Sequence, residues 1–208
     1  MHLKSVLARL FCISASVALV AASGARVAAQ NSSSLTNLLG QLNSAAASGG
    51  DPTLKSLGSE LGSKVQASHQ SLAGKPDTQG QLSGALKSIL GNKGGETLAA
   101  FQKLSQTKLT PEQAKLAKDA GHLGSAYLVH KNLGNLEGSQ SDVAQIVRSV
   151  RKGNFTEALP AIKKVSQNAK LTPAQKELLA SLAEKYAPGA SKESGALKGV
   201  KRNPDLGK

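Results

Sequence analysis

The sequence predicts an all-α protein, and two observations carry that prediction. Apolar residues recur at spacings of three and four along most of the chain, which is the period of an α-helix, and the alternation typical of a β-strand is nearly absent. A stretch of about 60 residues also occurs twice, with the same apolar spacing and the same helix-breaking residues in both copies. We therefore expect an N-terminal helical hairpin followed by a tandem duplication of a three-helix unit, arranged as a helical bundle or a short helical repeat.

Residues 1–29 have the three parts of a secretory signal peptide. Lys4 and Arg9 give a positive start, residues 10–22 form an apolar run, and Val27-Ala28-Ala29 forms a cleavage site of small residues. A run of about 13 apolar residues is shorter than the roughly 20 that cross a membrane, so cleavage is favoured over an uncleaved anchor. The prediction is an exported protein, periplasmic or extracellular, with no transmembrane span in the mature chain.

Cleavage after Ala29 changes the composition in two ways. It removes the only cysteine, so the remaining 179 of the 208 residues form no disulfide and depend on the burial of Leu, Val, Ile and Ala. It also removes three of the 26 basic residues and none of the 13 acidic ones, which leaves a formal charge of +10. An excess of this kind favours contact with anionic surfaces, but it carries no information about the fold.

The first two helices are expected within residues 30–76, the predicted N-terminal hairpin. Four leucines between residues 35 and 42 form one helical stripe, which ends before the glycines at 49 and 50. A second helix is predicted from Thr53 to about Leu72, because leucine and valine residues recur there at helical spacing.

The duplicated unit is displaced by 61 residues. The segment from Gln81 matches the segment from Asp142: apolar residues face apolar residues, Glu96 faces Glu157, and KLSQ faces KVSQ. One inserted residue later, KLTP occurs in both copies. The predicted divisions are three-helix unit 1 at 77–134, a linker at 135–140, three-helix unit 2 at 141–188 and a basic disordered tail at 189–208.

Each KLTP marks the start of the third helix of its unit. The hydroxyl of Thr110 or Thr172 can accept a hydrogen bond from a free amide of the first helical turn. Pro111 or Pro173 then takes the first helical position, where its missing amide proton is no loss. The doubled KLTP is therefore a structural signal and needs no catalytic explanation.

The sequence holds no clear catalytic or metal-binding motif. It lacks the motifs of serine nucleophiles and of phosphate-binding loops, and it indicates no cofactor and no small-molecule substrate. Asp119, His122 and His130 are spaced to share a helical face, but a metal site needs three or four converging ligands with oriented neighbours. A metal-assisted hydrolase centred on these three residues is the less favoured alternative.

The favoured interpretation is an exported, non-enzymatic helical binding protein. Basic residues gather on the first two helices of unit 2, which could present them together to another protein or to an anionic polymer. A structural protein that self-assembles in the cell envelope is another alternative, because helix faces can pair between copies. The predicted contact residues are Arg148, Arg151, Lys152, Lys163 and Lys164.

Overall fold

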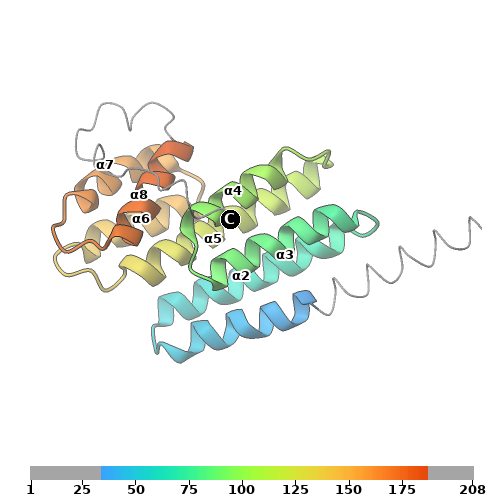
Figure 1. The fold of residues 1–208 in the computed structure, drawn as a ribbon, viewed down its shortest axis with the longest axis horizontal. Helices are drawn as coiled ribbons and strands as arrows, with labels where there is room; N and C mark the ends of the chain where they lie inside the picture. Colours follow the sequence, from blue (N-terminus) through green and yellow to red (C-terminus); the bar gives the residue numbers. More distant parts are fainter. Residues whose placement is uncertain (1–33, 187–208) are drawn as a thin grey trace, which may run out of the picture.

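The computed structural model, described here for residues 34–186, is all helical. A helix covers residues 34–48, and α2 (Pro52–Ser71), α3 (Pro76–Leu90), α4 (Gly94–Ser105) and α5 (Pro111–Leu133) follow it. The chain continues with α6 (Gln140–Arg151), α7 (Phe155–Ser166) and α8 (Pro173–Tyr186). No strand occurs in residues 34–186, so the all-α prediction is confirmed (Figure 1). The predicted signal peptide and the predicted basic tail lie outside the described residues.

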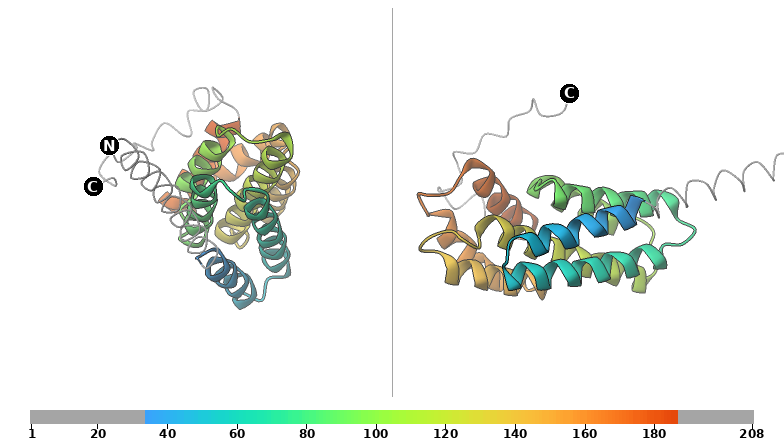
Figure 2. Two further views of the ribbon diagram at one scale, coloured as in Figure 1. Left: turned by 90° about the vertical axis from the view of Figure 1, so that its right-hand side faces the viewer. Right: turned by 90° about the horizontal axis from the view of Figure 1, so that it is seen from below.

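The chain wraps its helices around α5. This helix packs along α2, α4 and α6, while α8 packs on α4 and α7. Figure 1 shows α6, α7 and α8 at one end of the molecule and the helix of residues 34–48 with α2 and α3 toward the other. The same helix lies beside α2 from the further directions of Figure 2, so the first two helices form a hairpin.

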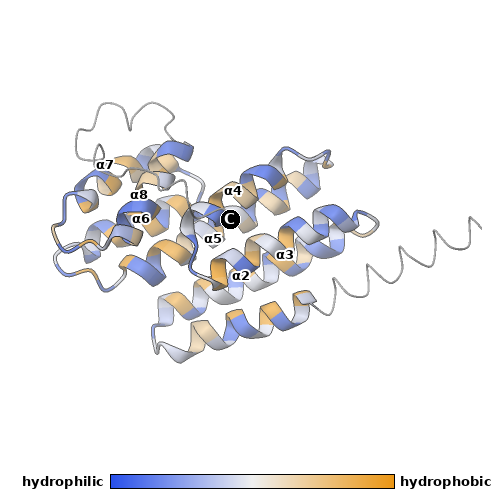
Figure 3. Cartoon of the chain, in the orientation of Figure 1, coloured by the Kyte–Doolittle hydropathy of each residue, from blue (hydrophilic) through white to orange (hydrophobic). Residues whose placement is uncertain are grey.

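One hydrophobic core extends through the described part of the chain, from Leu35 to Ala183. Figure 3 shows apolar and hydrophilic residues alternating around the helices, which is the pattern of helices that bury one face. Close packing of α5 depends on a small residue: a Cβ at Gly124 would lie 2.8 Å from Cδ1 of Ile89 on α3. Within residues 34–186, no helix combines the length and the apolar composition that crossing a membrane requires.

The helix boundaries repeat with the displacement of the sequence match. Both ends of α4 and α7 are 61 residues apart, α3 and α6 end 61 residues apart, and α5 and α8 begin 62 residues apart. The turns before α4 and α7 also agree, because Asn92 and Gly153 both have a positive φ, of 59° and 72°. In each turn the next amide donates to a serine carbonyl, that of Ser88 at 2.9 Å or that of Ser149 at 2.8 Å.

Both KLTP sequences start a helix in the predicted way. Thr110 Oγ1 accepts a hydrogen bond from the amide of Gln113 at 3.3 Å, and Gln113 Oε1 accepts one from the amide of Thr110 at 3.1 Å. Thr172 and Gln175 form the same reciprocal pair, with distances of 3.3 and 2.8 Å. This arrangement is a capping box, which satisfies two amides that the helix itself leaves without acceptors.

The two glutamines of these caps also connect helices that are distant in sequence. Gln113 Nε2 donates to the carbonyl of Ser71, at the end of α2, at 2.5 Å. Gln175 Nε2 donates to the carbonyl of Asn132, near the end of α5, at 2.6 Å. Carbonyls in the last turn of a helix have no intrahelical donor, so each glutamine satisfies one of them. Each KLTP therefore starts one helix and holds the end of another.

Candidate functional site

The five basic residues predicted as a contact surface lie on α6, on α7 and in the turn between them, and they differ in their partners. Arg151 forms an ion pair with Glu60 on α2, and Lys164 Nζ lies 2.9 Å from Asp142 Oδ2 in the first turn of α6. The other three are exposed, and their side chains make no ion pair or hydrogen bond with any residue of the described part. These three are Arg148, Lys152 and Lys163.

The antiparallel hairpin of α6 and α7 separates these three cations. Arg148 and Lys152 are four residues apart at the end of α6, so they share one stripe of that helix. Lys163 lies at the end of α7, beside the first turn of α6, as the contact between Lys164 and Asp142 shows. The structure therefore brings Arg148 and Lys152 together and places Lys163 at the opposite end of the hairpin. We call these three residues the basic face.

A groove of about 540 Å³ lies between α6 and α7. Gln145 partly bridges it, because its Nε2 donates to the carbonyl of Glu157 at 3.4 Å. Pro160 lies inside α7, where a proline removes one backbone hydrogen bond and so weakens the regular ladder of the helix. The residues that line the groove are Ser141, Gln145, Arg148 and Ser149 from α6 and Glu157 and Pro160 from α7.

The polar groups of the groove have few protein partners. Ser149 is only 4 % exposed, and its hydroxyl makes no hydrogen bond with any residue between 34 and 186. Arg148 and Glu157 both line the groove, but within the same range neither side chain forms an ion pair. Because Ser149 lines the groove, its hydroxyl can donate a hydrogen bond to a ligand that enters there.

The matched positions 61 residues earlier are arranged differently. Glycines at 80 and 84 stand where the groove has Ser141 and Gln145. The hydroxyl of Ser88, which matches Ser149, donates to the carbonyl of Gly84 at 3.2 Å. Glu96, which matches Glu157, pairs with Lys93 at 3.0 Å. The polar groups that the first unit satisfies internally are thus available in the second.

The residues of the predicted hydrolase site have separate partners. Asp119 pairs with Lys64 on α2 at 3.3 Å, and His130 Nε2 lies 2.6 Å from Oδ2 of Asp51, the N-cap of α2. Burial raises the pKa of Asp51, but hydrogen bonds from His130 and from two backbone amides outweigh it and hold this pKa below its ordinary value. Both contacts fasten α2 to α5.

His122 is the third residue of that set, and it packs against the turn between α6 and α7. Its ring meets the ring of Phe155 edge to face, with centroids 5.1 Å apart. Burial lowers the pKa of His122, the charges of Lys118 and Lys185 lower it further, and Asp119 opposes them. In the part of the chain that the structure describes, no three His, Cys, Asp or Glu side chains gather in a way that could hold a metal ion.

No protein-family model, no curated protein and no solved structure matches this chain. Sequence reasoning selected Arg148 but missed the groove around it. The signal that could have indicated the groove is the replacement of Gly80 and Gly84 in the first copy by Ser141 and Gln145 in the second.

Proposed function

We propose that this chain is an exported, non-enzymatic binding protein that contacts an anionic polymer through the basic face. The observation that supports the proposal best is that Arg148, Lys152 and Lys163 are exposed and unpaired among the described residues. Arg151 and Lys164, by contrast, form ion pairs with carboxylates of the protein itself. The basic face is therefore smaller than the predicted contact surface, and it consists of these three cations.

The separation of the cations favours an extended ligand over a compact one. A helix rises 1.5 Å per residue, so α6 and α7, of 12 residues each, are about 18 Å long. Arg148 and Lys152 lie near one end of this length and Lys163 near the other. A chain of regularly spaced negative charges can reach both ends at once, whereas a single small anion cannot.

The aromatic content favours electrostatic binding over base stacking. The sequence has no Trp, two Tyr and three Phe, and of these Tyr127 and Phe101 are buried. Proteins that hold single-stranded nucleic acids commonly stack bases on exposed aromatic rings. Contact through cations alone predicts an affinity that falls steeply with salt and depends little on the chemical identity of the polymer.

The proposal is tested with the mature chain, residues 30–208, and a fluorescently labelled heparin fragment over a range of salt concentrations. We expect Lys152→Gln with Lys163→Gln to weaken binding and to reduce the slope of log K against log salt by about one to two. The matched control is Lys87→Gln with Lys103→Gln, which removes the same charge from the first unit. Equal losses from both pairs would show that net charge alone drives binding and would overturn the proposal.

Export rests on the signal-peptide pattern of residues 1–29 and has its own test. When the full chain is expressed in a host with a secretory pathway, we expect the protein outside the cytoplasm to begin at Gln30. N-terminal sequencing or intact-mass analysis measures this directly. An intact N-terminus on cytoplasmic protein would remove the exported part of the proposal and leave the binding part standing.

A further inference from the structure

We propose that the groove between α6 and α7 binds a small zwitterion of the amino-acid or short-peptide class, with the ligand carboxylate on Arg148 and the ligand ammonium on Glu157. This inference shares Arg148 with the proposed polymer contact but does not depend on it. The volume of about 540 Å³ lies within the range of about 300 to 1,000 Å³ that is typical of small-molecule sites.

The charges of the groove favour a ligand that carries both signs. Arg148 comes from α6 and Glu157 from α7; both line the groove, and neither forms an ion pair with the other or with another described residue. A simple anion would meet the carboxylate of Glu157, and a simple cation would meet the guanidinium of Arg148. A zwitterion avoids both repulsions, and its carboxylate suits the planar donor pair of an arginine.

Local structure supports the same assignment. Glu157 lies in the first turn of α7, where the helix dipole favours a negative charge. The Ser149 hydroxyl, on a residue 4 % exposed, offers a donor that no described residue uses, next in sequence to Arg148. A second oxygen of the bound carboxylate, or a peptide carbonyl, would accept from it. Gln145 keeps a free acceptor, because only its Nε2 is used within the described residues.

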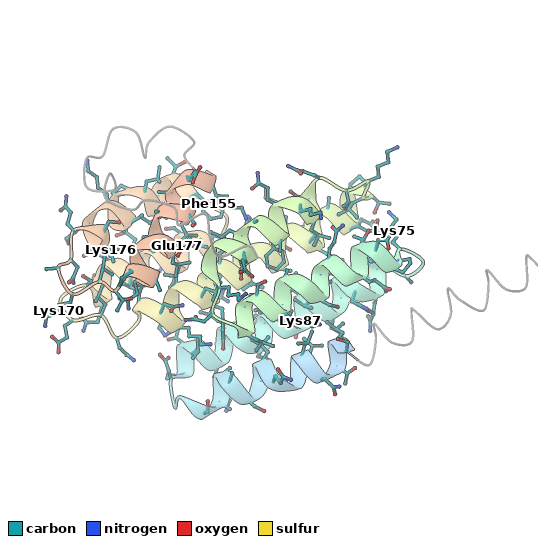
Figure 4. All side chains as sticks on the ribbon, viewed as in Figure 1. Lys75, Lys87, Phe155, Lys170, Lys176 and Glu177 are labelled. Atoms are coloured by element: carbon teal, nitrogen blue, oxygen red, sulfur yellow. The ribbon has the colours of Figure 1, made fainter. Side chains whose placement is uncertain are left out.

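The hairpin of α3 and α4 provides a comparison within the same molecule. Its glutamate, Glu96, is neutralised by Lys93, and its serine hydroxyl donates to a backbone carbonyl. Lys87, which matches Arg148, lies on α3, away from the α6–α7 hairpin (Figure 4). The two hairpins have the same backbone plan, so the difference between them isolates the side chains that the groove needs.

The test measures binding of the dipeptide Ala-Ala to the mature chain by titration in nitrogen-15 correlation spectra. We expect saturable shifts of the amide signals of α6 and α7. N-acetyl-Ala-Ala, which lacks the ammonium, and Ala-Ala amide, which lacks the carboxylate, should each bind about tenfold or more weakly, since a charge-assisted hydrogen bond is lost. Inorganic sulfate is the probe for a simple anion site.

Variants then assign the two ends of the ligand. Glu157→Gln should abolish the preference for Ala-Ala over N-acetyl-Ala-Ala. Arg148→Gln should abolish the preference for Ala-Ala over Ala-Ala amide. The matched variants Glu96→Gln and Lys87→Gln should leave both preferences unchanged. These four side chains are exposed, and a thermal melt of each variant confirms that the fold is retained.

The same variants separate this site from the polymer contact. Glu157→Gln should weaken dipeptide binding and leave heparin binding as strong or stronger. Lys152→Gln with Lys163→Gln should weaken heparin binding and leave dipeptide binding unchanged. Absence of saturable shifts up to the solubility limit of Ala-Ala would overturn the inference. So would equal binding of the acetylated dipeptide or of sulfate, because either result would mean an anion site.

Discussion

The imidazole ring of His122, on α5, occupies the space that a side chain at residue 153 would need. A Cβ placed on Gly153 would overlap Cε1 of the ring and lie 2.8 Å from its Nδ1. Gly153 also has a φ of +72°, a backbone conformation that side chains disfavour. One glycine therefore lets the turn between α6 and α7 adopt its shape and lets it approach α5.

Gly153→Ala is expected to lower the free energy of unfolding by about 2 to 4 kcal/mol, because the positive φ and the overlap with His122 each have a cost. Urea unfolding measures the change. Gly138→Ala is the control for the φ alone and should cost about 1 kcal/mol, because Gly138 has a φ of 73° and a Cβ there would meet no atom within 4 Å. In a His122→Ala background the cost of Gly153→Ala should fall to a similar value. An unchanged cost in that background would contradict the role of His122.

Lys185 should make stability depend on pH in the alkaline range. Its Nζ donates to the carbonyl of Leu98 at 3.4 Å, and burial lowers its pKa from 10.5 to about 8. Between these values the unfolded chain holds a proton on this residue that the folded chain has lost. The contribution of Lys185 to the free energy of unfolding therefore rises with pH from about 8 to 10.5.

Lys185→Met keeps the hydrocarbon part of the side chain and removes the buried charge. We expect it to raise the free energy of unfolding at pH 7 by about 1 to 3 kcal/mol, after the loss of the polar contacts of the ammonium group is counted. The advantage of the variant should shrink as the pH rises above 8. Urea unfolding at several pH values measures it, and the exposed Lys176→Met is the control. A difference that stays constant with pH would refute the assigned cause.

Asp51 should stabilise the protein at neutral pH and lose this effect in acid. It caps α2 through the amides of Thr53 and Leu54, at 2.8 and 3.2 Å, and it contacts His130. Asp51→Ala is expected to cost about 2 kcal/mol at pH 7. Because its pKa lies below 3.8 in the folded protein, the difference between variant and wild type should vanish as the pH falls below that value. Asp77→Ala, in the first turn of α3, is the control and should show a much smaller effect at any pH.

Gln175 should contribute more to stability than Thr172, its partner in the capping box of α8. Thr172→Ala removes one hydrogen bond of the capping box and should cost about 1 kcal/mol. Gln175→Ala removes the other bond and also the contact with the carbonyl of Asn132, so we expect about 2 kcal/mol. Thermal or urea unfolding ranks the two variants. Equal costs would mean that the contact with α5 contributes nothing.

Tyr127 carries a hydroxyl whose removal should not harm the fold. Its ring is fully buried on α5, and its oxygen has no hydrogen-bond partner among the described residues. Burial also raises the pKa of this phenol. Tyr127→Phe keeps the packing and is expected to be neutral or to stabilise by about 1 kcal/mol. A loss of more than about 1 kcal/mol would indicate a partner for the hydroxyl.

The helices were predictable because their signals are local. The stripe of leucines before Gly49 predicted the helix now seen at residues 34–48, and the second helix, predicted from Thr53 to about Leu72, runs from Pro52 to Ser71. The KLTP sequences predicted the starts of α5 and α8 at their prolines. Caps, breaks and apolar spacing all act within a few residues, so a single sequence displays them.

The partners of the charged residues were not predictable in the same way. Arg151 and Lys164 belong to the same basic cluster as Arg148 in the sequence, yet the fold supplies each with a carboxylate, Glu60 from α2 and Asp142 from α6. Asp119 and His130 share a helix with His122, but in the structure Asp119 pairs with Lys64 on α2, and His130 pairs with Asp51, the N-cap of α2. Such pairings depend on residues that are far apart in the chain, and only the packing of the helices brings them together.

The sequence by itself determined the helices, their caps and the local backbone of the two matching segments, because hydrogen bonds and apolar periodicity within a few residues define all three. The tertiary structure decided which polar side chains at the matching positions form hydrogen bonds or ion pairs within the protein and which can still bond to a ligand. Ser88 and Ser149 match in sequence, but only Ser149 keeps a hydroxyl without a described partner, in a groove beside Arg148 and Glu157. Ser88 bonds to a backbone carbonyl of its own helix, whereas Ser149 lines a groove that exists only because α6 and α7 pack together.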